Sequence, residues 1–191
     1  MSASRPIEML EAEHRVILKI VGVLGVLADA LEAGRPIHPQ TLRDLVEFMR
    51  TFADKCHHGK EEAHLFPALA SRGVPTQGCP IGGLMHEHQK GRALVAELDR
   101  AAQTYFQQTT PEVKAVIVRC LRDLAALYPN HIWKEDYLVF PMSGKVLSEA
   151  DNADLQRKFE AVEAEIGSDV HHRLEALAEK LQADAGALVI A

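Results

Sequence analysis

The sequence predicts an all-α protein built as a helical bundle, and three observations support this fold class. Apolar residues recur with helical spacing over long stretches of the 191-residue chain. Alanine and leucine are abundant, whereas aromatic residues make up only 5% of the chain, and this composition favours helices. The helical stretches are separated by short segments that contain glycine and proline. The length is that of one ordinary domain, and a hydrophobic content of 47% can fill its core.

Four long helices and a further helical region are expected. Their predicted ranges are 7–33, 41–70, 81–107, 111–140 and 151–184. Gly34 should end the first helix, because glycine suits the position just after a helix. Pro67 should end or kink the second helix, and Pro129 should kink the fourth. Thr110 is a good N-cap for the fourth helix.

One motif occurs twice in the chain, 74 residues apart. Residues 57–67 read HHGKEEAHLFP, and residues 131–141 read HIWKEDYLVFP. Laid over each other without a gap, the two stretches share His, Lys, Glu, Phe and Pro. A second match lies upstream at the same offset, where the Glu-His pair at 13–14 corresponds to the pair at 87–88. Each half of the chain therefore contains E-H, then H-x-x-x-E, then F-P.

The spacing within this repeat is typical of metal ligands. A His and a Glu four residues apart on a helix point from the same face, one turn apart, so both can reach one metal pair. Imidazole binds iron, zinc and similar metals, and a carboxylate can bridge two of them. A single H-x-x-x-E is more often a surface ion pair, but its recurrence together with the E-H pair favours ligands. The sequence thus predicts a two-metal site whose ligands are His14, His57, Glu61, His88, His131 and Glu135.

Neighbouring histidines compete with two of these ligands. His58 also forms an H-x-x-x-E pattern, but it corresponds to Ile132 in the second copy, so the internal alignment selects His57. His86 lies two residues before His88 and should face another side of a straight helix. His64 is expected beside the site or at the surface. Whether His58, His64 or His86 replaces or adds to a ligand stays open.

Two further acidic residues follow the predicted ligands directly. Glu62 and Asp136 occupy equivalent places in the two copies. A carboxylate near a metal site often holds the second nitrogen of a ligand imidazole. We therefore expect Glu62 and Asp136 to orient ligand histidines.

Charge and cysteine content limit the functional classes. The formal net charge of −6 argues against electrostatic binding to nucleic acid or an anionic membrane. Residues 1–14 contain acids where a signal peptide has an apolar core, and no apolar run is long enough to span a bilayer, so the expected location is the cytoplasm. Three cysteines without a CxxC motif do not indicate a disulfide framework or a zinc knuckle; they are Cys56, Cys79 and Cys120.

At the repeated residues the chain resembles the hemerythrin-like, or HHE cation-binding, family. The resemblance rests on the ordered E-H, H-x-x-x-E and F-P elements of both copies and covers about residues 7–142. It implies an up-down-up-down four-helix bundle over residues 1–145 that holds a non-haem di-iron centre bridged by Glu61 and Glu135. Residues 146–191 would form a helical extension packed on the bundle. That extension contains no part of the repeat, its His171 and His172 are expected at the surface, and it would cap the bundle or mediate formation of a homodimer.

One departure from the family bears on the function that the resemblance implies. Animal oxygen-carrying hemerythrins have H-x-x-x-H on the third helix and an Asp after the fourth, whereas this chain has H-x-H and Glu135. Its iron coordination would be more open, which weakens the oxygen-carrier interpretation. Bacterial relatives with this ligand set are associated with oxygen or nitric oxide sensing, oxidative stress and repair of iron–sulfur centres. We therefore expect a di-iron protein that binds or reacts with O₂, NO or peroxide.

Four alternatives remain at this level. The protein could store or deliver iron, or it could repair iron–sulfur centres, although it lacks the extra N-terminal cysteine-containing domain of the known repair proteins. It could be a di-iron oxidase or peroxidase, because metals activate O₂ and peroxide. It could also be a structural helical protein that binds no metal. The same ligands would hold zinc or manganese as well as iron.

Overall fold

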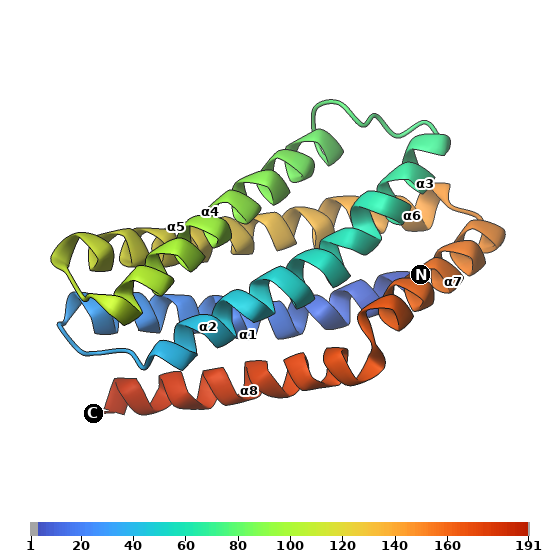
Figure 1. Cartoon of the computed structure of the whole chain (residues 1–191). Helices are drawn as coiled ribbons and strands as arrows, with labels where there is room; N and C mark the ends of the chain where they lie inside the picture. Colours follow the sequence, from blue (N-terminus) through green and yellow to red (C-terminus); the bar gives the residue numbers. More distant parts are fainter. Residues whose placement is uncertain (1–3, 191) are drawn as a thin grey trace.

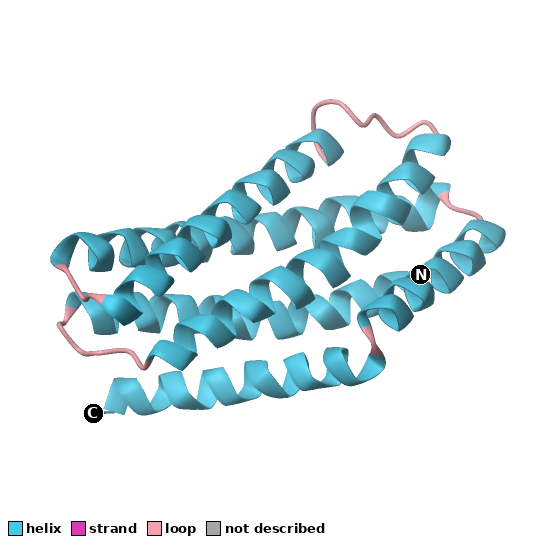
Figure 2. Cartoon of the chain, viewed as in Figure 1, coloured by secondary structure: helices cyan, strands magenta, loops and turns pink. Residues whose placement is uncertain are grey.

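The structure is a computed structural model that describes residues 4–190, with the backbone alone for residues 188–190. Residues 1–3 and 191, which the predicted domains include, lie outside the described part. Within the described part every element is helical, which confirms the predicted all-α class (Figure 2). The elements in chain order, with η for a π-helix, are α1 (Arg5–Glu32), α2 (Pro39–Phe48), η1 (Met49–His58), η2 (Glu61–Leu65), α3 (Phe66–Ser71), α4 (Ile81–Gln107), α5 (Pro111–Lys134), η3 (Glu135–Val139), α6 (Phe140–Val146), α7 (Glu149–Ile166) and α8 (Ser168–Ile190).

The long helices pack side by side into a bundle. α5 contacts both α1 and α4, and α8 runs along α1 (Figure 1). Each helix buries a stripe of apolar residues spaced three or four positions apart, and the stripes face one another. α1 ends, as predicted, next to Gly34, whose φ of 75° lies in the left-handed region that favours glycine.

The predicted second helix is helical over nearly its whole length, but its hydrogen bonding changes along the way. α2 passes into η1, and a short link leads on to η2 and α3. In a π-helix the hydrogen bonds join residues five apart, so each turn holds more residues than an α-helical turn. Pro67 does not end this segment, which continues to Ser71, because the proline lies in the first turn of α3, where it is tolerated.

The fourth segment repeats part of this pattern. α5 begins as predicted after Thr110, whose side chain accepts a hydrogen bond from the backbone N–H of Val113. The helix continues through Pro129 and passes into η3 and α6. η2 and η3 begin at Glu61 and Glu135, the two glutamates of the repeat. The repeat in sequence is therefore also a repeat in local structure.

The C-terminal region, expected as one helical stretch, consists of two helices. α7 starts with a capping box between Ser148 and Asp151 and stops before Gly167, which has a φ of 97°. The chain turns at Gly167, and α8 then runs along α1 (Figure 1). Leu174 and Leu181 of α8 are buried in the same hydrophobic cluster as residues of α1 and α5. The predicted domain boundary after residue 145 stays a prediction.

Two hydrophobic clusters fill the bundle, one on each side of a polar band. Along α1, Leu10 belongs to one cluster and Ile17 to the other, and His14 lies between them. Ile132 and Val139 flank Glu135 on the fourth segment in the same way. The polar residues of this band are therefore enclosed by apolar packing that keeps water away from them.

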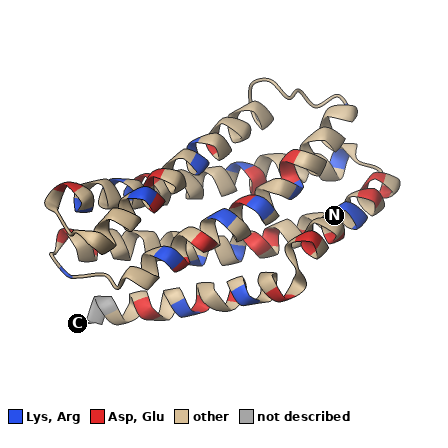
Figure 3. Cartoon of the chain, viewed as in Figure 1, with Lys and Arg blue, Asp and Glu red and all other residues tan. Residues whose placement is uncertain are grey.

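The outer surface carries charges of both signs. Lys and Arg are interspersed with Asp and Glu along the helices (Figure 3). Among the described residues no helix is both long enough and apolar enough to cross a membrane.

Candidate metal centre

Four histidines of the repeat meet in the polar band. His14 lies on α1, His57 on η1, His88 on α4 and His131 on α5, and all four are buried. The Nε2 atoms of His14 and His57 are 3.0 Å apart, and those of His88 and His131 are 3.2 Å apart. Two pairs of imidazoles, one from each half of the chain, thus point their Nε2 atoms inward.

Two fully buried carboxylates lie between these pairs. Glu135 Oε2 is 3.1 Å from His14 Nε2, and Glu135 Oε1 is 3.2 Å from His131 Nε2. Glu61 Oε1 is 3.7 Å from His57 Nε2, and Glu61 Oε2 is 3.5 Å from His88 Nε2. Each carboxylate therefore approaches one imidazole of each pair. All six residues predicted from the repeat come together, and their role as metal ligands stays a prediction.

The two carboxylates lack the partners that buried charges require. None of the four carboxylate oxygens has a hydrogen-bond partner. Burial, together with the charge of Glu135, raises the pKa of Glu61 well above its usual range. Burial acts in the same direction on Glu135, but the neighbouring His131 and His14 outweigh it and hold the pKa of Glu135 well below its usual range. Cations between the carboxylates would supply the missing partners.

A carboxylate holds the other nitrogen of each imidazole. The four Nδ1 contacts are His14 with Asp136 at 2.7 Å, His57 with Glu13 at 2.9 Å, His88 with Glu62 at 2.6 Å and His131 with Glu87 at 3.1 Å. Such contacts orient an imidazole and raise its basicity as a ligand. The expectation that Glu62 and Asp136 orient histidines is confirmed. The same role of Glu13 and Glu87 was not predicted, although both directly precede a histidine of the repeat.

His58 is a member of the centre that the sequence did not select. Its ring stacks on His88 with 3.8 Å between centroids, and its Nδ1 lies 3.3 Å from Asp54 Oδ1. Its Nε2 is buried without a hydrogen-bond partner. His57 and His58 both face inward because η1 is π-helical and successive side chains are closer in direction than in an α-helix. The adjacent H-x-x-x-E pattern was the available signal, and the mismatch with Ile132 argued against it.

The donor atoms form two groups, each compact enough for one metal ion. The first group contains His14, His57, Glu61 and Glu135. The second contains His58, His88 and His131. Within each group the donor atoms lie within 4.8 Å of one another. His64 and His86 belong to neither group, and His86 is exposed. The imidazole and carboxylate donors suit iron, zinc or manganese.

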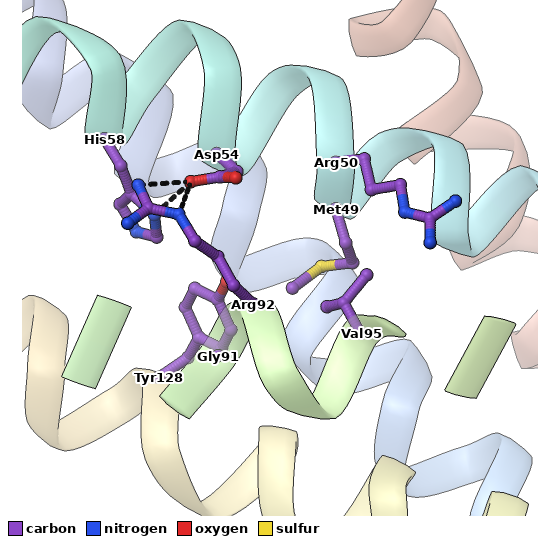
Figure 4. Close-up of a pocket in the computed structure, with 8 residues that line it drawn as sticks. All are labelled: Met49, Arg50, Asp54, His58, Gly91, Arg92, Val95 and Tyr128. Carbon is purple, nitrogen blue, oxygen red and sulfur yellow. Dashed lines mark hydrogen bonds and ion pairs between the residues drawn. The ribbon is translucent and has the colours of Figure 1, made fainter. Parts of the chain in front are cut away.

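A pocket of about 220 Å³ opens beside the second group (Figure 4). Buried His58 and Tyr128 line its inner part, and the more exposed Arg92 lies toward solvent. Arg92 donates hydrogen bonds of 2.8 Å to Asp54 and to Glu62; the sequence alone left open whether this arginine pairs with a carboxylate near the site or lies free at the surface. Gly91 also lines the pocket, and a Cβ there would make ordinary van der Waals contact, 3.7 Å from the Tyr128 hydroxyl oxygen.

Comparisons with known proteins agree with this geometry. The model of the hemerythrin HHE cation-binding domain matches residues 5–143, which include all seven inward donors. Uncharacterized proteins of Mycobacterium tuberculosis and Mycobacterium bovis are each 28% identical over 158 residues, a stretch that covers 80% of this chain and 59% of theirs. The chain thus spans about three fifths of the length of these curated relatives. No solved structure matches the chain significantly.

Proposed function

Because the chain belongs to the hemerythrin HHE cation-binding domain family, we propose that it is a non-haem di-iron protein that binds or reacts with O₂, NO or peroxide in sensing or in a stress response. The observation that carries this proposal is the buried pair Glu61 and Glu135. Their oxygens face imidazole nitrogens of both halves and lack hydrogen-bond partners. Buried carboxylates of this kind require cations or protons.

From the two donor groups we propose which residues would hold each iron. His14 and His57 would hold one iron, and His58, His88 and His131 would hold the other. Glu61 and Glu135 would bridge both. When bound, the iron pair supplies coordination positions and redox chemistry for a small molecule. The first donor group thus contains two imidazoles and both carboxylates, and the second contains three imidazoles.

The surroundings of the centre favour small molecules as reactants. The bundle encloses the donors between two hydrophobic clusters, and the pocket beside His58 holds about 220 Å³. That volume accommodates a diatomic molecule or a peroxide with a few waters but not a large organic substrate. Tyr128 and Arg92 line this pocket, and both side chains carry hydrogen-bond donors.

We also infer that four helical segments form the up-down-up-down bundle of the family. The segments are α1, α2 through α3, α4, and α5 through α6. Figure 1 supports this topology, because the loops that connect them lie at alternating ends of the molecule. The extension of α7 and α8 then packs on α1.

Optical titration of the iron-loaded protein tests the proposed function. The protein is reduced without air, and its absorption spectrum is recorded before and after adding O₂, NO or hydrogen peroxide. Iron per chain is counted on the same sample. We expect about two irons per chain and a rapid spectral change with at least one of the three reactants.

Two other outcomes would contradict the proposal in different ways. Two irons that react with none of the three molecules would exclude sensing and favour iron storage or delivery. Less than about one iron per chain after loading would contradict the di-iron centre itself. The same titration with zinc and manganese establishes which metal the centre prefers.

A further inference from the structure

A separate cluster of polar residues, none of them a proposed metal ligand, lies directly behind His57. It consists of Glu13, Cys56, Lys60, Glu163 and His171. Glu163 belongs to α7 and His171 to α8, so the C-terminal extension supplies two of the five members. His171 was expected at the surface, but it is largely buried, with 13% exposure. The extension therefore reaches the surroundings of the metal centre.

These residues form a continuous chain of hydrogen bonds that ends on a ligand. His57 Nδ1 contacts Glu13 Oε2 at 2.9 Å. Lys60 Nζ donates to the other oxygen of Glu13 and also to Glu163 Oε1, the latter at 2.7 Å. Lys60 is completely buried, so its ammonium group depends on these two carboxylates for compensation of its charge.

The turn between α7 and α8 holds Glu163 in place. Gly167 ends α7 four residues after Glu163, and the backbone N–H of Gly167 donates to the Glu163 carbonyl. On the first turn of α8, His171 Nδ1 lies 3.9 Å from Glu163 Oε1 and 3.7 Å from Cys56 Sγ. The His171 ring also packs on Phe52 of η1, with 4.9 Å between centroids. The side chain of Glu163 is thus contacted by Lys60 and by His171 of α8, and His171 is itself packed against η1.

The other half of the molecule contains the same series of hydrogen bonds, but without an equivalent of Glu163. His131 Nδ1 contacts Glu87 at 3.1 Å, and Lys134 donates to Glu87. Lys134 is 34% exposed, whereas Lys60 is 0% exposed. Since Lys134 reaches solvent, water can compensate its charge, and Glu87 is held less rigidly than Glu13. The two halves therefore differ in the surroundings of this lysine: Lys60 is buried and pairs with Glu163 of the extension, whereas Lys134 reaches solvent.

We propose that Glu163 is a positioning residue for His57, through which the C-terminal extension stabilises the metal position formed by His14 and His57. The inference rests on the proposed function for its metal, and it concerns a segment that follows the matched family domain, residues 5–143. With Glu163 in place, Lys60 keeps Glu13 against His57 Nδ1, so His57 Nε2 stays directed at the metal position. At the second position Lys134 holds Glu87 against His131, but among the described residues no second carboxylate pairs with Lys134.

The test uses the full-length chain with Glu163→Gln, which keeps the size of the side chain and removes its charge. In the metal-free protein, the Nδ1–H proton of His57 is followed by NMR with ¹⁵N-labelled histidine and assigned with a His57 variant. We expect this signal to shift or broaden, with His131 unchanged. In the iron-loaded protein, transfer of iron to a chelator should become about tenfold faster for one iron and stay unchanged for the other.

Matched variants separate positioning from general loosening of the fold. Glu160→Gln lies one turn earlier on the exposed face of α7 and should change neither readout. Glu163→Asp keeps the charge with a shorter reach and should give an intermediate effect. Lys134→Gln should affect His131 and not His57. Circular dichroism confirms that each variant is folded.

The positioning role of Glu163 and the proposed function can be contradicted separately. An unchanged His57 signal in folded Glu163→Gln would overturn the positioning role, whatever the protein binds. If the chain retains no iron in any form, the proposed function fails, while the NMR result on the metal-free protein still decides the role of Glu163. If iron transfer to the chelator became equally faster for both irons, Glu163 would not act specifically on the His14–His57 position.

Discussion

The two halves of the bundle share one ligand pattern but surround it differently. Around the first proposed metal position, Glu13 and Lys60 are buried behind His57, and Glu163 of the extension pairs with Lys60. Around the second, the equivalent lysine reaches solvent, an additional histidine joins the donors, and a pocket opens beside it. The comparison teaches that an internal repeat can keep its ligands while the chain around them makes the two positions unequal.

The largest effect on iron binding is expected for Glu61 and Glu135, the two carboxylates that lie between the halves. Glu61→Gln and Glu135→Gln should each lower iron content from about two per chain to well below one, because each carboxylate is proposed to bind at both positions. Metal analysis after desalting measures the content, with Glu97→Gln, on the exposed surface, as the control. If either variant keeps one tightly bound iron, the carboxylates are not shared and the halves bind metal separately.

A single substitution makes the two halves more alike. His58→Ile introduces the residue found at the equivalent position, Ile132, and should remove one of the two irons, because the second donor group loses an imidazole. Iron analysis and chelator competition measure the loss. The control is His86→Ile, which changes an exposed histidine outside both groups. Full occupancy with unchanged affinity in His58→Ile would mean that the six residues of the repeat suffice.

The carboxylates that orient imidazoles across the halves should have a smaller effect. Asp136→Asn and Glu62→Gln are each expected to weaken iron binding about 10- to 100-fold, since they release His14 and His88 respectively. Glu62→Gln should have the larger effect, because Glu62 also accepts a hydrogen bond from Arg92. Competition with chelators of graded affinity measures both. Wild-type affinity in both variants would show that packing alone orients the imidazoles.

A pH dependence is expected at the first position, with a size that grows with the pH interval. Burial lowers the pKa of His14, but Asp136, which is hydrogen-bonded to Nδ1, and the Glu135 carboxylate near Nε2 outweigh burial and raise the pKa to about 9. Below that pH the metal-free protein carries a proton on His14 that the metal must displace. Affinity at this position should therefore rise about tenfold per pH unit between pH 7 and 9 and level off above.

Chelator competition across this pH range measures the dependence at the first position. Asp136→Asn should flatten it, because the raised pKa of His14 depends on Asp136. Affinity that stays flat from pH 7 to 9 in the unmodified protein would contradict the protonated His14.

Much of the helical framework could be predicted from local signals. The third helix was predicted with the bounds that α4 has, and Thr110 caps α5 as expected. Prolines were less informative, since Pro67 lies inside a continuous helical segment. Pro67 follows the π-helical turn η2 and lies in the first turn of α3, where its missing N–H is tolerated.

The surroundings of the site were predicted less completely than its ligands. The recurrence of the E-H and H-x-x-x-E elements identified the six donors, and residues four apart on a helix share a face. His58 was not selected, because the alignment of the two halves excludes any residue that only one half contains. His171 was expected at the surface, since nothing in its own segment shows that α8 returns along α1.

The sequence by itself determined the all-α class, the positions of the long helices and the inward histidines and glutamates of the repeat. These follow from periodicity and from ligand spacing, which are properties of neighbouring residues. Only the tertiary structure decided which nitrogen each carboxylate holds, that His58 joins the second donor group, and that Glu163 reaches Glu13 through Lys60. Those contacts join residues far apart in the chain, so they depend on how the helices pack and not on any local pattern.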